Sequence, residues 1–128
     1  MAADRLISSG GPWENVAGYS RAVVAGPWVL VSGSTSTVEG TVRHVGDAYA
    51  QTIEAFGVIR RALEVAGLSL SDIVRTRLYL ADMAHLDDVA RAHKELFDVT
   101  RPANTMIEIS GFADPAMLIE VEADAYRA

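Results

Sequence analysis

The sequence predicts an α+β fold in which a sheet of about six strands carries two helices on one face. Two segments, 47–66 and 86–97, place apolar residues at steps of three and four, the spacing of one helix face. Several shorter segments are rich in β-branched and aromatic residues or alternate between apolar and polar residues, as strands do. The chain has 128 residues, half of them apolar, and this is enough for one domain, residues 1–128, with a real core.

The predicted elements follow in the order β-β-β-α-β-α-β-β. Strands are expected at 4–8, 19–25 and 28–33, with a loop at 10–13 between the first two. A polar Ser/Thr segment at 34–37 precedes a short extended piece near 41–45. The first helix is expected over 47–66, and it should end at Gly67 because glycine favours the left-handed backbone found after helix C-termini.

In the second half of the chain, the strand predicted at 73–80 alternates in character. Val74, Thr76, Leu78 and Leu80 are expected to face the helices, and Ile73, Arg75, Arg77 and Tyr79 the other side. The apolar stripe of the second helix consists of Leu86, Val89, Ala90, His93 and Phe97. The last two strands are expected at 105–109 and 118–125, joined through 111–115.

The strand at 28–33 is apolar on both faces, because Trp28 and Leu30 alternate with Val29 and Val31. A strand of this kind is usually buried on both sides. Two helices cover only one face of the sheet, so we expect a homo-oligomer that packs the helix-free faces together. The alternative is a central strand that only loops cover.

Composition excludes several functions. The net charge is −6, with 11 basic against 17 acidic residues and a single lysine, Lys94, so nucleic acid is not an expected partner. No apolar run reaches the roughly 18 residues of a membrane-spanning helix, and no membrane partner is expected. The N-terminus lacks the pattern of a secretory signal, so a cytoplasmic protein is expected. The absence of cysteine excludes disulfides, thiolate metal sites and cysteine nucleophiles.

Two motifs near the C-terminus carry a family resemblance. Arg101-Pro102-Ala103 precedes one predicted strand, and Ile119-Glu120-Val121-Glu122 lies in the next. They combine with Gly18-Tyr19, Val31-Ser32-Gly33, Ala66-Gly67-Leu68 and Asp72-Ile73-Val74-Arg75. In order and spacing, over nearly the whole chain, these segments resemble the RidA family, also called YjgF/YER057c/UK114. The resemblance implies a chorismate-mutase-like fold and a homotrimer that associates through its sheets, with ligand pockets between neighbouring subunits.

Deaminases of this family hydrolyse reactive enamines and imines, such as 2-aminoacrylate, to ketoacids and ammonia. The resemblance implies that Glu120 is associated with water and that Tyr19, Gly33 and Met106 line the pocket. The family deaminases hold the substrate carboxylate with an arginine, where this chain has Asn104. Exchanging a charge-assisted pair for a neutral hydrogen bond weakens binding by about 1–3 kcal/mol. The chain therefore resembles the branches of the family that lack this arginine.

We predict Glu120 as the catalytic residue and Tyr19, Gly33, Asn104 and Met106 as ligand-binding residues. Arg77 is a further ligand-binding candidate, because it could replace the missing cation. Four of these residues have a structural alternative. Asn104 could bond its own backbone, Tyr19 could be an ordinary strand aromatic, and Glu120 and Arg77 could belong to salt bridges between neighbouring strands.

No metal site or cofactor is predicted, because His44, His85 and His93 are far apart in the sequence and His93 is expected to be a core histidine. The favoured function is hydrolysis of an imine or enamine intermediate with altered specificity, on a small carboxylate or imine ligand. One alternative is a non-catalytic small-molecule binder or sensor. The other, an endoribonuclease or translation inhibitor, is disfavoured by the acidic charge.

Overall fold

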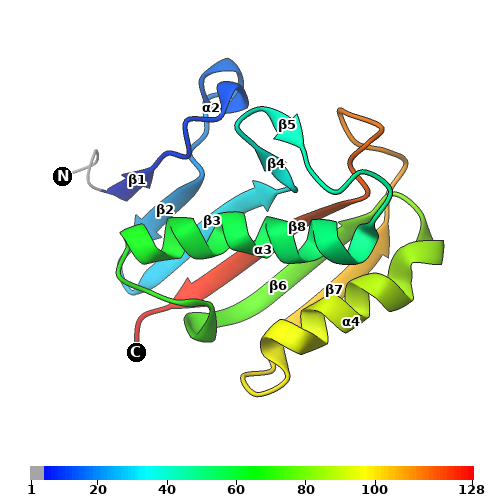
Figure 1. The fold of residues 1–128 in the computed structure, drawn as a ribbon. Helices are drawn as coiled ribbons and strands as arrows, with labels where there is room; N and C mark the ends of the chain where they lie inside the picture. Colours follow the sequence, from blue (N-terminus) through cyan, green and yellow to red (C-terminus); the bar gives the residue numbers. More distant parts are fainter. Residues whose placement is uncertain (1–4) are drawn as a thin grey trace.

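The computed structural model describes residues 5–128 and contains a six-stranded sheet with two long helices on one face (Figure 1). The elements are β1 (Leu6–Ile7), α2 (Pro12–Ala17), β2 (Ala22–Ala25), β3 (Trp28–Ser34), β4 (Thr37–Val38), β5 (Thr41–Val42), α3 (Ala48–Val65), β6 (Ile73–Leu80), α4 (Leu86–Phe97), β7 (Ala103–Glu108) and β8 (Ile119–Tyr126). Short 3-10 turns span Leu70–Asp72 and Met83–His85. The predicted α+β class is confirmed. Asp4, in the first predicted strand, lies outside the described residues.

The strands of the main sheet lie in the order β1-β2-β3-β8-β6-β7. Only β6 and β7 run parallel, because α4 connects them as a crossover; the other neighbours are antiparallel. The C-terminal strand β8 is therefore inserted between β3 and β6. This topology places β7 at one edge of the sheet and the β1–β2 pair at the other.

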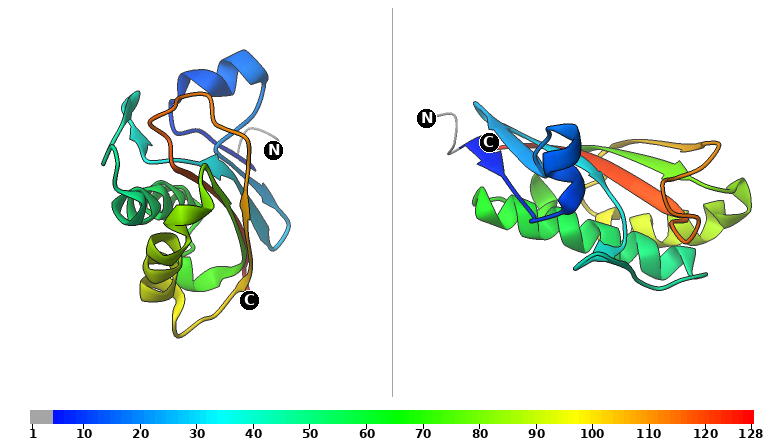
Figure 2. Two further views of the ribbon diagram at one scale, coloured as in Figure 1. Left: turned by 90° about the vertical axis from the view of Figure 1, so that its right-hand side faces the viewer. Right: turned by 90° about the horizontal axis from the view of Figure 1, so that it is seen from above.

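Helices α3 and α4 lie side by side against one face of the sheet (Figures 1 and 2). The side chain of Asp47 caps α3 by accepting a hydrogen bond of 2.9 Å from the backbone N–H of Ala50. Gly67 follows the helix with a φ of +78°, as its predicted role as a helix stop requires. The core lies between the helices and the sheet and contains Phe56, Ile59, Leu63, Leu78, Leu80 and Val121, all fully buried.

Within residues 5–128, the opposite face of the sheet carries no helix and keeps large apolar side chains in solvent. Val29 and Val31 are buried toward the helices, whereas Trp28 and Leu30 remain 41% and 44% exposed. Tyr126 of β8 packs edge-to-face against Trp28, with ring centroids 4.9 Å apart. The strand β3 is thus apolar on both faces, as predicted, and its helix-free side is free to meet another apolar surface.

The prediction of a loop at 10–13 was wrong at its end, because α2 begins at Pro12. Proline is favoured in the first turn of a helix. The carboxylate of Glu14 accepts hydrogen bonds from the backbone N–H groups of Ser9 and Gly11, at 3.1 and 3.2 Å, and so caps the start of the helix. A helix of six residues is too short to show apolar periodicity.

Three smaller predictions also need correction. The strand expected from residue 19 begins only at Ala22, because Tyr19 follows directly on the end of α2. The extended piece expected near 41–45 is present as β5, but the strand β4 that pairs with it in a hairpin was not expected. The pairing of β6 with β8 is irregular between Ile73 and Arg75. The first residues of β6 therefore face the sides opposite to those predicted, so that Ile73 is buried and Val74 is exposed.

Candidate functional site

A groove at one end of the sheet brings together three of the predicted site residues, Tyr19, Gly33 and Glu120. Its volume is about 1210 Å³, and its walls come from α2, the β4–β5 hairpin, α3 and the loop between β7 and β8. Gly33 and Glu120 lie on the adjacent strands β3 and β8. Tyr19 reaches the groove because Gly18 ends α2 in a left-handed conformation, with a φ of 76°.

The Glu120 carboxyl group lies over the backbone of Gly33. A Cβ atom at position 33 would stand 2.7 Å from Oε1 of Glu120, so any side chain there would displace the carboxyl group. Burial is the main cause that raises the pKa of Glu120, the nearby charge of Glu122 raises it further, and Arg21 lowers it. A carboxyl group with a raised pKa keeps its proton to higher pH than an ordinary carboxyl group, which suits a role in proton transfer.

Arg21 is a member of this groove that the sequence interpretation missed. Its Nη1 atom donates to the carbonyl oxygen of Gly33 at 2.6 Å and to Oγ of Ser34 at 3.1 Å. Its Nη2 atom donates to the hydroxyl of Tyr19 at 3.4 Å, and the guanidinium lies 5.6 Å from the centre of that ring. Arg21 therefore fixes Tyr19 and Gly33 relative to each other and places a positive charge near Glu120. Its position beside Tyr19, immediately before an apolar strand, was the available sequence signal.

Asn104 and Met106 lie away from Glu120, on the edge strand β7. Register pairs Asn104 with Thr76 and Met106 with Leu78, so both belong to the side of the sheet that carries the helices. Nδ2 of Asn104 donates to Oγ1 of Thr76 at 2.9 Å. Within the described chain, five of the predicted site residues thus fall into two separate groups, and Arg77 belongs to neither.

His93 lies behind Asn104. Its Nε2 atom is 2.8 Å from Oγ1 of Thr76, and its ring packs against Phe56 and Phe97, with centroid distances of 5.9 and 4.7 Å. Burial lowers the pKa of His93. The expectation of a core histidine with a hydrogen-bond partner agrees with this environment.

Arg77 points to the helix-free face of the sheet. Its Nη1 atom lies 3.7 Å from Oε1 of Glu122 and 3.6 Å from Oδ2 of Asp124. The hydroxyl of Tyr79 also donates to Glu122, at 2.9 Å. The ion pairing that we considered as an alternative for Arg77 is therefore present, and its Glu122 and Asp124 partners lie on the strand that carries Glu120.

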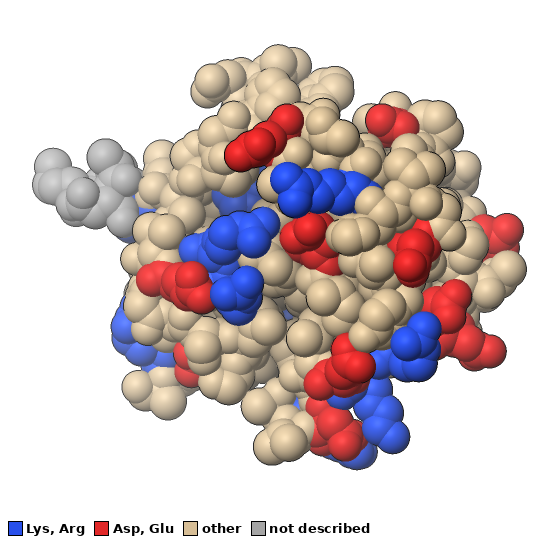
Figure 3. Space-filling model, viewed as in Figure 1, with Lys and Arg blue, Asp and Glu red and all other residues tan. Residues whose placement is uncertain are grey.

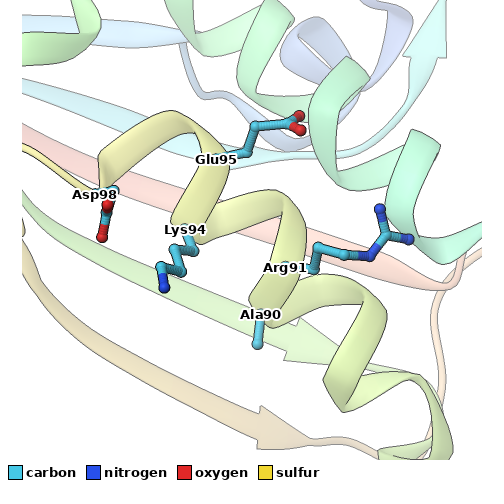
Figure 4. A pocket seen from close by; sticks show the side chains of 5 residues that line it. All are labelled: Ala90, Arg91, Lys94, Glu95 and Asp98. Atoms are coloured by element: carbon cyan, nitrogen blue, oxygen red, sulfur yellow. The ribbon is translucent and has the colours of Figure 1, made fainter.

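A second, shallow depression lies on the outer surface of α4, lined by Ala90, Arg91, Lys94, Glu95 and Asp98 (Figure 4). Arg91 and Glu95 extend toward α3, where the Arg91 guanidinium lies 4.0 Å from the centre of the Tyr49 ring and Glu95 accepts a hydrogen bond from the Tyr49 hydroxyl. These contacts join the two helices. The depression includes none of the predicted site residues.

Among residues 5–128, no group of three or more His, Asp or Glu side chains is arranged to hold a metal ion. Neither long helix combines the length and the apolar run that crossing a membrane requires.

Comparison with known proteins identifies the family. A family model described as endoribonuclease L-PSP matches residues 12–127. An uncharacterized protein of Streptomyces coelicolor is 44% identical over 125 residues, which cover 98% of this chain and 93% of that protein. The 3-aminoacrylate deaminase RutC of Acinetobacter baylyi is 33% identical over 127 residues, covering 98% and 99%.

Among solved structures, the crystal structure of a YjgF/YER057c/UK114 family member from Mycobacterium tuberculosis superimposes with a TM-score of 0.85 at 40% identity. The match covers 94% of this chain and 97% of that one. The sheet, the two helices and the sequence thus agree with one family over almost the full length. The chain belongs to the RidA (YjgF/YER057c/UK114) family, whose family model is described as endoribonuclease L-PSP.

Proposed function

We propose that the protein hydrolyses small imines or enamines to a carbonyl compound and ammonia, and that Glu120 is its catalytic residue. The observation that carries this proposal is the position of the Glu120 carboxyl group, which is half-buried in the groove, lies directly over Gly33 and has a raised pKa. The name of the similar Acinetobacter protein, 3-aminoacrylate deaminase, supports the same class of reaction.

An enamine first becomes the imine by gaining a proton on carbon and losing one from nitrogen. Hydrolysis of the imine then needs one group that moves protons twice. In the first step, the oxygen of water bonds to the imine carbon, and a proton of the water passes through Glu120 to the nitrogen. In the second step, the hydroxyl proton passes through Glu120 to the nitrogen, the C–N bond breaks, ammonia leaves and the carbonyl forms. A carboxyl group with a raised pKa suits both transfers. Arg21 and Tyr19 position the ligand, and Arg21 limits how far the pKa of Glu120 rises.

The second part of the site, in this proposal, comes from a neighbouring copy of the chain in a homotrimer. Asn104 and Met106 lie on an edge strand, where a neighbour can approach, and they do not share the groove lining with Glu120. The exposed Trp28, Leu30 and Tyr126 give the helix-free face an apolar surface that association would cover. Arg77 contributes to ligand binding if association of the subunits brings the ligand carboxylate to this face.

The test is ammonia release from imino acids generated in the assay by an amino-acid oxidase, measured above uncatalysed hydrolysis. We expect Glu120→Gln to lower kcat/KM by about 10²-fold or more. Wild-type protein that releases no ammonia above background would refute the proposal. Asn104→Arg should raise the activity on carboxylate substrates, because a guanidinium binds a carboxylate in two places. If it does not, the groove differs from the family deaminases in more than this residue.

A non-catalytic binder or sensor is the second candidate, and one observation favours it. The Asn104 amide is neutral and already bonded to Thr76, so it supplies less binding energy to a carboxylate than a free guanidinium would. Ligand binding without turnover would support this alternative. Binding of pyruvate, measured by calorimetry beside the ammonia assay, distinguishes the two. Arg77→Ala belongs in the same experiment: unchanged pyruvate affinity would leave Arg77 with its ion pairs alone.

The description of the family model, endoribonuclease, calls for an RNA-cleavage assay on the same samples. Phosphate binding depends on clustered Lys and Arg side chains. On the face shown in Figure 3, basic and acidic side chains are intermixed, and the chain carries six more acidic than basic charges. We therefore expect no cleavage above a buffer control.

A further inference from the structure

Three side chains form a continuous hydrogen-bonded chain from the surface of β7 to the core. Asn104 is exposed at the sheet edge and donates from Nδ2 to Oγ1 of Thr76 at 2.9 Å. Thr76 is fully buried, and its Oγ1 lies 2.8 Å from Nε2 of His93. The middle member is a hydroxyl, which has a single proton to donate. The protonation of His93 at one end of this hydrogen-bonded series therefore constrains which atoms Asn104 turns toward Thr76 at the other end.

The direction of the hydrogen bonds follows from this single proton. When Nε2 of His93 carries no proton, the Thr76 hydroxyl donates to it and accepts from Nδ2 of Asn104. The carbonyl oxygen of Asn104 then points away from Thr76. When Nε2 carries a proton, it donates to Thr76, and the Thr76 proton needs a new acceptor. Turning the Asn104 amide by half a rotation supplies its carbonyl oxygen as that acceptor and leaves the NH₂ group pointing outward.

Leaving the Thr76 proton without an acceptor is the unfavourable alternative. The hydroxyl is fully buried, and a buried polar group without a hydrogen-bond partner destabilises the folded protein. Rotation of an exposed amide about its terminal bond costs much less, since that torsion is broad and roughly two-fold. The amide turn is therefore the favoured response to protonation.

We propose that His93 is a positioning residue that sets, through Thr76, whether Asn104 presents a hydrogen-bond acceptor or a donor to the ligand. With neutral His93 protonated on Nδ1, Asn104 presents its carbonyl oxygen and selects ligands that carry an N–H or O–H donor. With Nε2 protonated, Asn104 presents its NH₂ group and donates a hydrogen bond to a carboxylate. This inference rests on the proposed function in one respect, that Asn104 contacts the ligand.

The surroundings of His93 make its protonation the controlling event. Its neighbours are the uncharged Phe56 of α3, Phe97 of α4 and Thr76 of β6, with Asn104 of β7 beyond Thr76. Burial among these uncharged side chains lowers the pKa of His93. Lys94 and Glu95 follow it on α4, and Glu95 is engaged with Tyr49. The transition should therefore occur below the ordinary pH range of histidine titration.

The first test uses the ligand-free protein and NMR. His93 ring nitrogens and the Asn104 side-chain amide are followed with ¹⁵N labelling from neutral to mildly acidic pH. At neutral pH, Nε2 of His93 should be the unprotonated nitrogen. The Asn104 amide resonances should then shift with the same midpoint as His93. Different midpoints, or an Asn104 amide that does not respond, would overturn the proposal in the wild-type protein alone.

Two variants separate the relay from a general effect of charge. Thr76→Val keeps the size of the side chain and the charge of His93 but removes the hydroxyl, so His93 should still titrate while the Asn104 amide no longer follows it. Thr76→Ser keeps the hydroxyl and should restore the coupling. An Asn104 response that persists in Thr76→Val would show that the charge acts through space and would overturn the relay.

The second test adds pyruvate, whose carboxylate stays ionised over this range. Its affinity should rise by about tenfold as His93 becomes protonated, the effect of roughly one hydrogen bond. Thr76→Val should lose this dependence. If the NMR coupling is present but pyruvate affinity does not change with pH, Asn104 does not contact the ligand and that part of the proposed function fails. If the coupling is absent, the relay fails and the Glu120 proposal is unaffected.

Discussion

Gly33→Ala should move the Glu120 carboxyl group without removing it. The new Cβ atom would stand 2.7 Å from Oε1 and 2.8 Å from Cδ of Glu120, where ordinary van der Waals contact begins at 3.4 Å. The carboxyl group therefore has to withdraw by about 0.7 Å, which is close to the 1 Å displacement that can lower a rate by about 10²-fold. Gly33 does not have a positive φ, so its backbone accommodates alanine.

The cost to stability should be small, because the atoms that must move belong to the end of a flexible side chain. An altered Glu120 rotamer costs about 0.5–1.5 kcal/mol. We therefore expect the free energy of unfolding, measured with urea, to change by no more than this amount. In the ammonia-release assay, kcat/KM should fall by about 10–100-fold. The substitution separates the position of the carboxyl group from its presence.

Gly57→Ala is the matched control, because a Cβ atom at position 57 of α3 meets only the side-chain ends of Glu54 and Arg61, at 3.5 and 3.6 Å. It should raise stability by about 0.5–1 kcal/mol, as alanine does relative to glycine in a helix, and leave kcat/KM unchanged. A folded Gly33→Ala variant with wild-type kcat/KM would refute the reasoning, because the chemistry would then not depend on where Glu120 lies.

Three further predictions concern stability and assembly. Asp47→Ala removes the cap of α3 and should lower the free energy of unfolding by about 1 kcal/mol in urea titrations; no change would mean that the cap is dispensable. Glu120→Gln should raise the free energy of unfolding at neutral pH, because the raised pKa of Glu120 means that burial disfavours its charged form. This gain in stability should shrink as pH falls through the folded-state pKa of Glu120, and a gain that is independent of pH would contradict the prediction. Leu30→Glu should dissociate the proposed trimer in sedimentation experiments, and a wild-type monomer would contradict the assembly.

The regular elements could be predicted from sequence because their signals are local. The stripe that includes Phe56 and Leu63 predicted α3, and Gly67 predicted its end. The alternation in β6 predicted the directions of Thr76 and Arg77. The helix α2 was missed because six residues give no periodicity, and the reversed pair at the start of β6 was missed because a register irregularity depends on the partner strand.

The candidate site was harder to predict because its parts depend on pairing between strands. Arg21 reaches Gly33 through the antiparallel pairing of β2 with β3, including the 2.9 Å hydrogen bond from the Ser32 N–H to the Arg21 carbonyl. The hydrogen bond from Asn104 to Thr76 depends on the parallel register of β6 with β7. Family resemblance identified the positions, but only the register shows which of them meet.

The central claim is that the Glu120 carboxyl group carries out proton transfer in imine hydrolysis. The most direct measurement compares ammonia release by wild-type protein and Glu120→Gln on the same enzymatically generated imino acid, with equal pyruvate binding as the control for an intact groove. The account predicts release above background by the wild type and a loss of about 10²-fold or more in the variant. Equal release by both proteins, or no release by the wild type, would contradict it.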